Sequence, residues 1–303
     1  MTYILGIDLG GTRIKVEAID PASGASLGTW RRETRDGELV GDVPAFACEI
    51  GDAIHTAALQ LGGQPDAVGL SSPGLADARS ERIAFMPGRL RGLEGFDWPG
   101  YLDMPGRVRV LNDGHAALLG EAWLGAARGL QDVVLLTLGT GVGGAVLCQG
   151  KLLRGHIGRA GHFGHMTVDA AGPPDICGTP GSLEDAIGNW NVETRSGSRF
   201  ASTDALTRAC REGDPAAAAV WNQSLDALAA AIASLINILD PEAVLIGGGI
   251  AVSGNLLFDG LAHRLESIEW RPLGRGVRVA PCQLGDAAGS YGAACFAANP
   301  EAY

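Results

Sequence analysis

The chain has 303 residues, of which 46% are hydrophobic, and it carries a formal net charge of −11 at pH 7. This length predicts two domains, and the hydrophobic content is sufficient for packed cores. The acidic balance excludes a global basic field for nucleic acid or an anionic membrane, although Arg13 and Lys15 could still meet the phosphates of a nucleotide.

Two further features bear on location. No run of about 18 uncharged apolar residues occurs, so neither a membrane span nor a signal peptide is expected. The six cysteines lie far apart and form no C-x-x-C pair, as is typical of reduced thiols. We therefore expect a cytoplasmic protein.

The first half of the chain opens with two apolar runs joined by a glycine turn. Tyr3–Ile7 and Ile14–Ile19 have the composition of strands, and the turn between them reads Asp8-Leu9-Gly10-Gly11-Thr12. An Ala-rich helix is predicted at about Ala45–Leu61, followed by a strand at Ala67–Leu70.

A long stretch rich in Pro and Gly, Asp77–Pro105, comes next and is predicted as a loop. Irregular segments of this length in compact domains tend to be functional. A strand at Val108–Leu111 then leads into Asn112-Asp113 and a helix that runs to about Ala127.

The second half repeats this opening with a strand at Val133–Thr137, a glycine turn at Leu138–Gly144 and a strand at Ala145–Leu147. Strands and helices alternate afterwards, and the clearest are Pro215–Leu239, Ala243–Ile246 (which meets Gly247-Gly248-Gly249), Asn255–Ser267 and Ala287–Ala298. The repeated opening predicts a duplicated α/β unit with two mixed sheets and a cleft between them. We expect an N-terminal lobe of residues 1–120 plus about 287–303, and a C-terminal lobe of residues 121–286.

The two glycine turns indicate phosphate binding. A strand–turn–strand unit exposes successive backbone N–H groups, which bind phosphate oxygens. Two such turns, one in each half, predict two lobes that grip one polyphosphate, as in an ATP-dependent phosphotransferase. Gly139, Gly141 and Gly144 match a dinucleotide-fold spacing, but a strand follows them where that motif opens a helix. The alternative for either turn alone is an ordinary hairpin with glycine at positive φ.

Two carboxylates lie at predicted strand ends. Asp113 follows a strand and begins a helix, where ligands of α/β folds bind, so it could accept the proton of a hydroxyl that attacks phosphorus. The alternative is that Asn112 and Asp113 only cap the helix. Asp8, beside the first turn, is a candidate for holding Mg²⁺ through water, or otherwise a turn-stabilising residue.

With these residues in view, the chain resembles glucokinase-like sugar kinases of the ROK (repressor, open reading frame, kinase) family. The motifs that carry the resemblance run in family order and are Leu5–Lys15, Ser72-Pro73-Gly74, Leu111–Glu121, Leu138–Gly144, Gly161-His162-Phe163-Gly164-His165, Ile246–Gly249 and Leu284–Gly289. The resemblance implies the α/β actin/hexokinase-like (ribonuclease H-like) two-lobe fold. It also implies transfer of the ATP γ-phosphoryl group to a sugar hydroxyl, commonly the one on C6.

The same resemblance implies roles for individual residues, with Asp113 as the general base. Residues implied to contact the sugar are Gly74, Asn112, Asp113, His162, His165 and Glu184. Residues implied to bind ATP and its Mg²⁺ are Asp8, Gly10, Gly11, Thr12, Lys15, Gly139, Thr140, Gly141, Gly247, Gly248 and Gly249.

The chain departs from the family pattern at its metal loop. Asp175 and Ser182 stand where two of the three zinc cysteines are found, so only His165 and Cys177 remain of the ligand set. Structural zinc normally needs four strong ligands, and we expect the family's zinc to be lost. The alternative is a rebuilt site of His165, Cys177 and Asp175, completed by His162 or water.

His162 is the second departure, because it stands in place of the family glutamate that contacts the sugar. An imidazole donates at least one hydrogen bond where a carboxylate only accepts. We therefore expect an altered sugar preference, for example for an acidic sugar. The alternative is that the imidazole is tolerated without consequence.

The ROK-type transcriptional regulator is an alternative class within the family. The acidic charge and the presence of only four residues before the first motif disfavour it. A non-catalytic sugar sensor of the same fold is the other alternative. We expect a homodimer with sugar and ATP as its small-molecule partners, and neither nucleic acid nor membrane.

Overall fold

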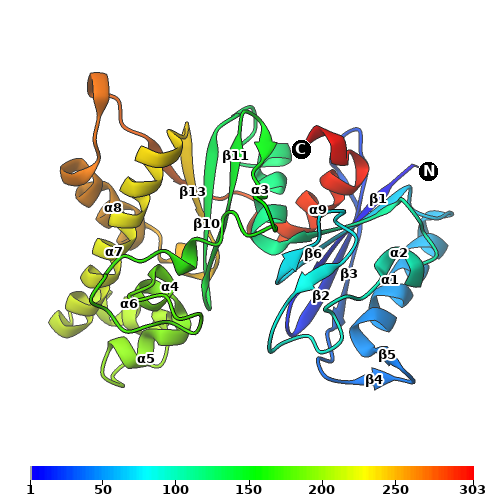
Figure 1. The fold of residues 1–303 in the computed structure, drawn as a ribbon, viewed down its shortest axis with the longest axis horizontal. Helices are drawn as coiled ribbons and strands as arrows, with labels where there is room; N and C mark the ends of the chain where they lie inside the picture. The colour runs from blue at the N-terminus through cyan, green and yellow to red at the C-terminus, as the bar shows by residue number, and fades with distance from the viewer. Residues whose placement is uncertain (1) are drawn as a thin grey trace. The chain divides into compact units, whose positions relative to one another are not determined.

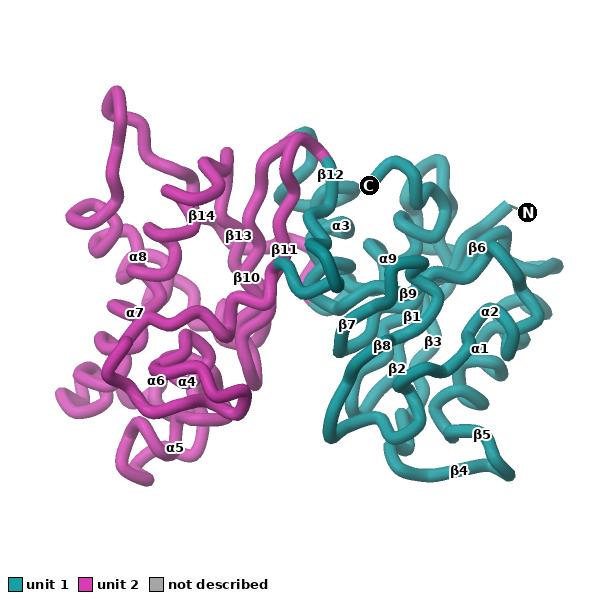
Figure 2. The backbone as a smooth tube through the Cα atoms, viewed as in Figure 1, with its two compact units in different colours: residues 1–129, 151–160, 286–303 teal, residues 130–150, 161–285 magenta. Residues whose placement is uncertain are grey.

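A computed structural model describes residues 2–303 (Figure 1). The chain forms two compact units. Unit 1 comprises the chain up to Gly129 together with Lys151–Ala160 and Asp286–Tyr303, and unit 2 comprises Leu130–Gly150 and Gly161–Gly285 (Figure 2).

The sheet of unit 1 has the strand order β3-β2-β1-β6-β9. The strands are β1 (Ile4–Leu9), β2 (Arg13–Ile19), β3 (Ser26–Glu33), β6 (Ala67–Ser72) and β9 (Val108–Asn112). β2 is antiparallel to β1 and β3, whereas β6 is parallel to both β1 and β9. Side chains on both faces of β1 and β6 are buried, which explains their continuous apolar runs.

Helices α1 (Ala45–Leu61), α2 (Trp98–Tyr101), α3 (Asp113–Leu124) and α9 (Ala288–Ala298) complete the core of unit 1. α9 packs against α3, β6 and β1. The approach is so close that a Cβ atom on Gly69 of β6 would lie 1.9 Å from the Ala293 carbonyl oxygen. The C-terminal helix therefore belongs to unit 1, and the chain ends in the short turn η6 (Pro300–Ala302).

Five short strands lie around these elements: β4 (Leu39–Val40), β5 (Val43–Pro44), β7 (Leu75–Ala76), β8 (Ile83–Phe85) and β12 (Lys151–Leu152). β8 and α2 fall inside the predicted loop Asp77–Pro105, so the prediction of a continuous loop is wrong. Trp98 explains the difference, because it is fully buried and anchors this stretch in the core.

Within unit 2, four strands of the second five-stranded sheet repeat the arrangement in the order β11-β10-β13-β14. These strands are β10 (Val133–Leu138), β11 (Val142–Cys148), β13 (Ala243–Gly247) and β14 (Arg278–Pro281). β11 is antiparallel to β10, and β13 is parallel to β10 and β14, as β2, β1, β6 and β9 are in unit 1. The predicted duplication is therefore present in the strand topology.

The helices of unit 2 are α4 (Leu183–Ile187), α5 (Val192–Arg195), α6 (Thr203–Arg211), α7 (Pro215–Leu239) and α8 (Asn255–Ile268). Its short 3₁₀ turns are η1 (Phe163–His165), η2 (Asn189–Asn191), η3 (Gly249–Ser253) and η4 (Pro272–Gly274), and η5 (Gly285–Ala287) leads from unit 2 into unit 1. Each unit has its own hydrophobic core.

α7 is the one helix in the described part of the chain that is long and apolar enough to cross a membrane. Half of its most apolar window is buried, and Leu225, Leu228 and Ile232 contribute to the core of unit 2. Packing in this core explains the apolar composition of the helix.

The compact units differ from the expected lobes in two places. A boundary at residues 120 and 121 would cut α3, which continues to Leu124 and ends before Gly125 rather than at Ala127. The carboxylate of Glu121 accepts from Ala126 N (2.7 Å), which holds the turn after the helix in unit 1. Lys151–Ala160 also belongs to unit 1, where Arg154 Nη2 donates to the Asp77 carbonyl (2.6 Å).

Candidate active site

The first glycine turn joins β1 to β2 in unit 1 and is held by Thr34, the buried residue that follows β3. Thr34 Oγ1 donates to the Gly10 carbonyl (2.6 Å), and Thr34 N donates to the Thr12 carbonyl (3.1 Å). Neither Gly10 nor Gly11 has a positive φ, so an ordinary left-handed glycine hairpin does not explain them. A Cβ atom on Gly11 would meet no atom within 4 Å, which leaves this side of the turn open.

Asp8 lies near the end of β1, directly before this turn. Its Oδ1 accepts from Ser71 Oγ on the neighbouring strand β6 (2.9 Å). Burial raises the pKa of Asp8, and the charges of Asp113 and Asp286 raise it further, against the lowering effects of Ser71 and Lys15. An oxygen ligand among other carboxylates suits a hard divalent cation, so Asp8 fits the role predicted for it with Mg²⁺.

Lys15 on β2 forms an ion pair with Asp286. Its Nζ lies 3.0 Å from Asp286 Oδ2 and also donates to the Asp286 carbonyl (3.1 Å). This contact lowers the pKa of Asp286. The ammonium group expected to face the nucleotide is therefore partly neutralised by a residue that lies far away in the sequence.

Asn112 ends β9 and is the N-cap of α3. Its Oδ1 accepts from Gly114 N (2.9 Å) and His115 N (3.4 Å), and its Nδ2 donates to the Gly74 carbonyl (3.0 Å). Asn112 therefore caps the helix. The same side chain also ties the start of α3 to the turn that carries Gly74, so the structure brings these two predicted sugar residues together.

Asp113 is the first residue of α3, at the carboxyl end of a parallel strand. Its Oδ1 accepts from Gly114 N (2.8 Å), and its side chain still reaches solvent. Desolvation by the surrounding protein raises the pKa of Asp113, although the hydrogen bonds from Gly114 and Asn112 lower it. A carboxylate with a raised pKa is a stronger base, which is the property required of a group that takes a hydroxyl proton.

The second glycine turn joins β10 to β11 in unit 2 and is supported by residues 184–190, which we call the clamp segment. Glu184 Oε2 accepts from Val142 N (2.8 Å) at the end of the turn. A Cβ atom on Gly141 would lie 2.2 Å from the same carboxylate oxygen. The Glu184 carboxylate therefore packs directly against the turn, and a side chain at position 141 would displace it.

The far end of the clamp segment binds the beginning of the turn. Asn189 N donates to the Gly139 carbonyl and Trp190 N donates to the Thr140 carbonyl, both at 3.0 Å. The predicted phosphate residues of unit 2 are thus held by backbone hydrogen bonds from η2.

Arg195 holds the clamp segment through hydrogen bonds to its backbone carbonyls. Its guanidinium donates to the carbonyls of Asp185 (3.1 Å), Ile187 (3.4 Å) and Gly188 (2.8 Å). These groups lie at the C-terminal part of α4, where carbonyls have few partners within the helix. Burial lowers the pKa of Arg195 to about 10, against the opposing effect of Asp185.

The glycines predicted to lie near the adenosine follow β13. Gly248 has a φ of 87°, and a Cβ atom there would lie 2.3 Å from the Leu138 carbonyl oxygen. Gly249 begins η3, and a Cβ atom on it would meet nothing within 4 Å. Gly247-Gly248-Gly249 therefore lies beside the start of the second turn, as a common nucleotide site in unit 2 requires.

Comparison with known proteins agrees with this arrangement. The ROK family model matches residues 4–299. The chain is 32% identical over 289 residues to a glucokinase of Thermotoga maritima, and the alignment covers 86% of this chain and 86% of that protein. The chain belongs to the ROK family.

Solved structures lead to the same family. A ROK hexokinase from Thermus thermophilus has a TM-score of 0.82 at 31% identity, covering 97% of both chains. A ROK family glucokinase from Streptomyces griseus in complex with glucose and AMPPNP has a TM-score of 0.74 at 29% identity, covering 96% of this chain and 98% of that one. The predicted ROK sugar-kinase identity and the actin/hexokinase-like two-lobe α/β fold are confirmed.

In this ROK protein, the loop of residues 161–182 departs from the family's zinc motif, and its hydrogen bonds show how. Asp175 Oδ1 accepts from Cys177 N and Thr179 N, both at 2.8 Å, and Asp175 Oδ2 lies 2.8 Å from His165 Nδ1. Ser182 Oγ accepts from Asp185 N (3.2 Å) as the N-cap of α4. Asp175 and Ser182 therefore serve the turn and the helix.

In the described part of the chain, this loop supplies three candidate zinc ligands, one fewer than a structural zinc site uses. His165, Asp175 and Cys177 bring one possible ligand atom each to within 4.8 Å of one another. However, both oxygens of Asp175 already accept hydrogen bonds, and the oxygen of Ser182 caps a helix. Four strong and available ligands are what structural zinc requires.

The predicted sugar residues of unit 2 lie close to one another in this loop and its flanks. His162 directly precedes η1, and its carbonyl accepts from His165 N (3.3 Å). A Cβ atom on Gly164 would lie 3.1 Å from Glu184 Oε2, so η1 packs against the start of α4. The structure thus assembles His162, His165 and Glu184 around η1.

Three supporting residues, namely Thr34, Ser71 and Arg195, were not predicted from the sequence. Each forms a hydrogen bond with a site residue or with the clamp segment, across a large sequence separation or from a neighbouring helix. No local pattern marks them, because a lone Thr, Ser or Arg near a predicted element is common in any sequence. Asp286 lies in the motif Leu284–Gly289, but its ion pair with Lys15 was not predicted.

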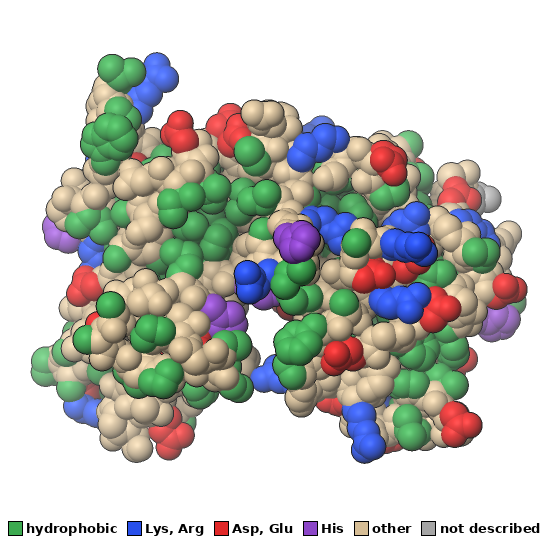
Figure 3. All heavy atoms as spheres, in the orientation of Figure 1, with side chains coloured by type: hydrophobic (Ala, Val, Ile, Leu, Met, Phe, Trp, Pro, Cys, Tyr) green, Lys and Arg blue, Asp and Glu red, His purple; other side chains and the backbone are tan. Residues whose placement is uncertain are grey.

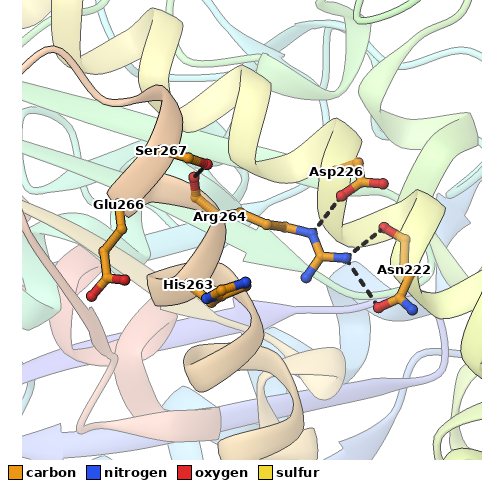
Figure 4. Close-up of a pocket in the computed structure, with 6 residues that line it drawn as sticks. All are labelled: Asn222, Asp226, His263, Arg264, Glu266 and Ser267. Atoms are coloured by element: carbon orange, nitrogen blue, oxygen red, sulfur yellow. Dashed lines mark hydrogen bonds and ion pairs between the residues drawn. The ribbon is translucent and has the colours of Figure 1, made fainter.

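Two surface hollows lie on the face made by α7 and α8, and neither is lined by a predicted site residue. Arg264 of α8 reaches across this face to Asp226 and Asn222 of α7 (Figure 4). The network joins the two helices. On the face shown in Figure 3, basic and acidic side chains are interspersed over unit 1.

Proposed function

We propose that this ATP-dependent sugar kinase phosphorylates the C6 hydroxyl of its sugar, with Asp113 as the general base. The observation that carries the proposal is the Asp113 carboxylate: it lies at the carboxyl end of β9, has a raised pKa and remains accessible to solvent. The neighbouring Asn112 holds this corner rigid through Gly114 and Gly74.

In the proposed reaction, the sugar hydroxyl oxygen attacks the γ-phosphorus while its proton passes to Asp113. The new O–P bond forms as the bond to the β-phosphate oxygen breaks, and ADP leaves. Phosphoryl transfer depends mainly on alignment and charge stabilisation, so one base and rigid supports are sufficient. When bound, Mg²⁺ would neutralise phosphate charge, and Asp8 is the residue that would hold it through water.

The two glycine turns are assigned to the phosphates. Gly10, Gly11, Thr12 and Lys15 would serve from unit 1, and Gly139, Thr140 and Gly141 from unit 2. The open space at Gly11 and the Glu184-supported turn at Gly141 support this assignment. Gly247-Gly248-Gly249 would take the adenosine, because Gly248 lies against the start of the second turn.

The sugar is assigned to Gly74, Asn112 and Asp113 of unit 1 and to His162, His165 and Glu184 of unit 2. His162 is proposed to change the sugar preference, since a hydrogen-bond donor replaces a carboxylate acceptor there. A cytoplasmic homodimer without nucleic-acid or membrane partners remains our expectation.

The test is a coupled ADP-release assay with Mg·ATP across hexoses, N-acetylhexosamines, sugar acids and polyols. Turnover should depend on one sugar class, and Asp113→Asn should lower kcat by about 10²–10⁴-fold, the usual contribution of general base catalysis. Unchanged turnover in a folded Asp113→Asn variant would overturn the base assignment. Sugar binding without any turnover in the wild type would favour the sensor alternative.

His162→Glu gives the matching test of sugar choice. It restores an acceptor, so the ratio of kcat/KM between sugars should shift towards neutral hexoses. An unchanged substrate profile would contradict the proposed role of His162.

A further inference from the structure

The carboxylate of Asp175 is the centre of the loop of residues 161–182. Its side chain is completely shielded from solvent and receives three contacts at 2.8 Å, from His165 Nδ1, Cys177 N and Thr179 N. Burial opposes the charge of Asp175, but the contacts with His165, Thr179 and Cys177 lower its pKa overall. A buried carboxylate with this many donors is a strong fixed anchor.

The contacts of Asp175 restrain the parts of this loop that a metal ion would otherwise restrain, but Asp175 does so by accepting hydrogen bonds from N–H groups. A structural metal fixes a histidine ring through one nitrogen and ties distant backbone segments together. Asp175 binds the His165 ring through Nδ1 with one oxygen and closes the turn at Cys177 and Thr179 with the other.

We propose that Asp175 takes the place of the family's zinc as the positioning residue for His165, so that this loop folds and functions without a metal. The inference deepens the proposed function, because it rests on His165 as a sugar contact. It extends that function by assigning a role to a residue that touches neither sugar nor ATP.

The contact with Asp175 also determines which nitrogen of the His165 ring carries the hydrogen. Because an ionised carboxylate only accepts, Nδ1 carries a hydrogen and donates to Asp175. In the neutral ring, Nε2 then has a free lone pair, and it faces the Cys177 thiol at 3.6 Å. A thiol is a weak donor, so a sugar hydroxyl can replace it and donate to Nε2.

The first experiment measures metal. Protein purified from cells grown with added zinc should contain far less than one zinc per chain, and a chelator should leave its melting temperature unchanged. Stoichiometric zinc whose removal lowers the melting temperature would overturn the proposal. This measurement needs no substrate, so it is independent of whether the proposed kinase activity is correct.

The second experiment uses Asp175→Asn, which keeps the shape and one oxygen for the Cys177 and Thr179 N–H groups. Its amide nitrogen would face His165 Nδ1 and donate to it, which moves the ring hydrogen to Nε2. Nitrogen NMR of His165, assigned with a His165→Gln variant, should therefore show the Nδ1–H form in the wild type and the Nε2–H form in the variant. An unchanged tautomer would contradict the proposal.

The third experiment measures steady-state kinetics with the sugar that the ADP-release assay identifies. Asp175→Asn should raise KM for the sugar by about 10–100-fold, the usual effect of losing a partner that orients a ligand, with a smaller change in kcat and in KM for ATP. Asp169→Asn is the matched control, because Asp169 lies exposed in the same loop and its carboxylate accepts from Ala171 N. Equal changes in both variants would overturn the positioning role.

Discussion

The two glycine turns share one topology but have different supports. Each joins an antiparallel pair whose first strand is parallel to a third. The turn in unit 1 is held by a neutral threonine, Thr34, whereas the turn in unit 2 is held by the carboxylate of Glu184 and the clamp segment behind it. Duplication thus preserved the strand topology, while the side chains that hold each turn differ.

The difference matters because removing a hydrogen bond to a charged side chain costs more free energy than removing one to a neutral side chain. Hydrogen bonds that involve a charged group contribute about 1.5–3 kcal/mol, and neutral ones about 0.5–1.5 kcal/mol. The turn of unit 2 should therefore be the more sensitive of the two, and a graded series of variants can test that order.

The largest effect is expected for Arg195→Met. The change leaves the carbonyls of Asp185, Ile187 and Gly188 without their donor, at a cost of about 3 kcal/mol of unfolding free energy. Urea unfolding measures the loss, and KM for ATP should rise more than KM for the sugar. Arg199→Met is the control, because Arg199 pairs with Asp214 at the surface. Similar losses in both variants would refute a specific role for Arg195.

Glu184→Ala is expected to have the next largest effect. Val142 N loses its acceptor, and we expect KM for ATP to rise about tenfold, which corresponds to about 1.4 kcal/mol. Glu184→Gln keeps an oxygen acceptor and should retain most of the ATP affinity while still weakening the sugar contact. Steady-state kinetics with each substrate varied separately make the distinction. The same KM for ATP in Glu184→Ala as in the wild type would rule out the turn support.

Thr34→Val probes the support in unit 1 and should have a smaller effect. It removes the bond from Oγ1 to the Gly10 carbonyl but keeps the shape, so we expect about 1 kcal/mol of lost stability and about a fivefold loss in kcat/KM for ATP. Thr29→Val is the matched control, because it also removes a hydroxyl hydrogen bond, here an exposed one from β3 to Glu17 rather than one to the turn. An effect larger than that of Glu184→Ala would reverse the order proposed for the two turns.

The carboxylates of Asp113 and Asp175 have pKa values shifted in opposite directions, and the shift of Asp113 predicts how kcat/KM depends on pH. Burial raises the pKa of Asp113, whereas hydrogen bonds lower that of Asp175. kcat/KM should therefore fall on acidification at a pH above the usual range for aspartate, as Asp113 takes up a proton. A pH–rate profile that stays flat until the ordinary aspartate range would contradict this.

The raised pKa of Asp113 affects stability in the opposite direction to activity: activity rises as Asp113 loses its proton, whereas the stability of the folded state falls. Because its folded pKa is raised, the unfolded state gives up the proton first, and the folded state loses stability as pH rises above the unfolded pKa. Asp113→Asn removes this cost, so the variant should be slightly more stable than the wild type at neutral pH, although its kcat is lowered. Thermal melts at acidic and neutral pH measure the effect, and the gain should disappear at low pH.

Much of the fold could be predicted locally. α1 and α7 have the predicted bounds because Pro44 precedes the first and Asp214-Pro215 opens the second, and both end where the backbone turns left-handed at Gly62 and Asp240. β3 was not predicted, because its alternation of half-buried and exposed polar residues gives little hydrophobic signal at a sheet edge. The short α4 and α5 were also missed, since helices of four or five residues depend on tertiary contacts.

The sequence by itself determined the repeated strand–turn–strand openings, the positions of Asp8 and Asp113 at strand ends, and the loss of two family cysteines. These features depend on residue order and local backbone preference, which a linear pattern records. Only the tertiary structure decided that Glu184 supports the second turn, that Arg195 holds Glu184's segment, and that Asp175 anchors His165. Such contacts depend on which side chains folding brings together, and that is set by the packing of whole elements.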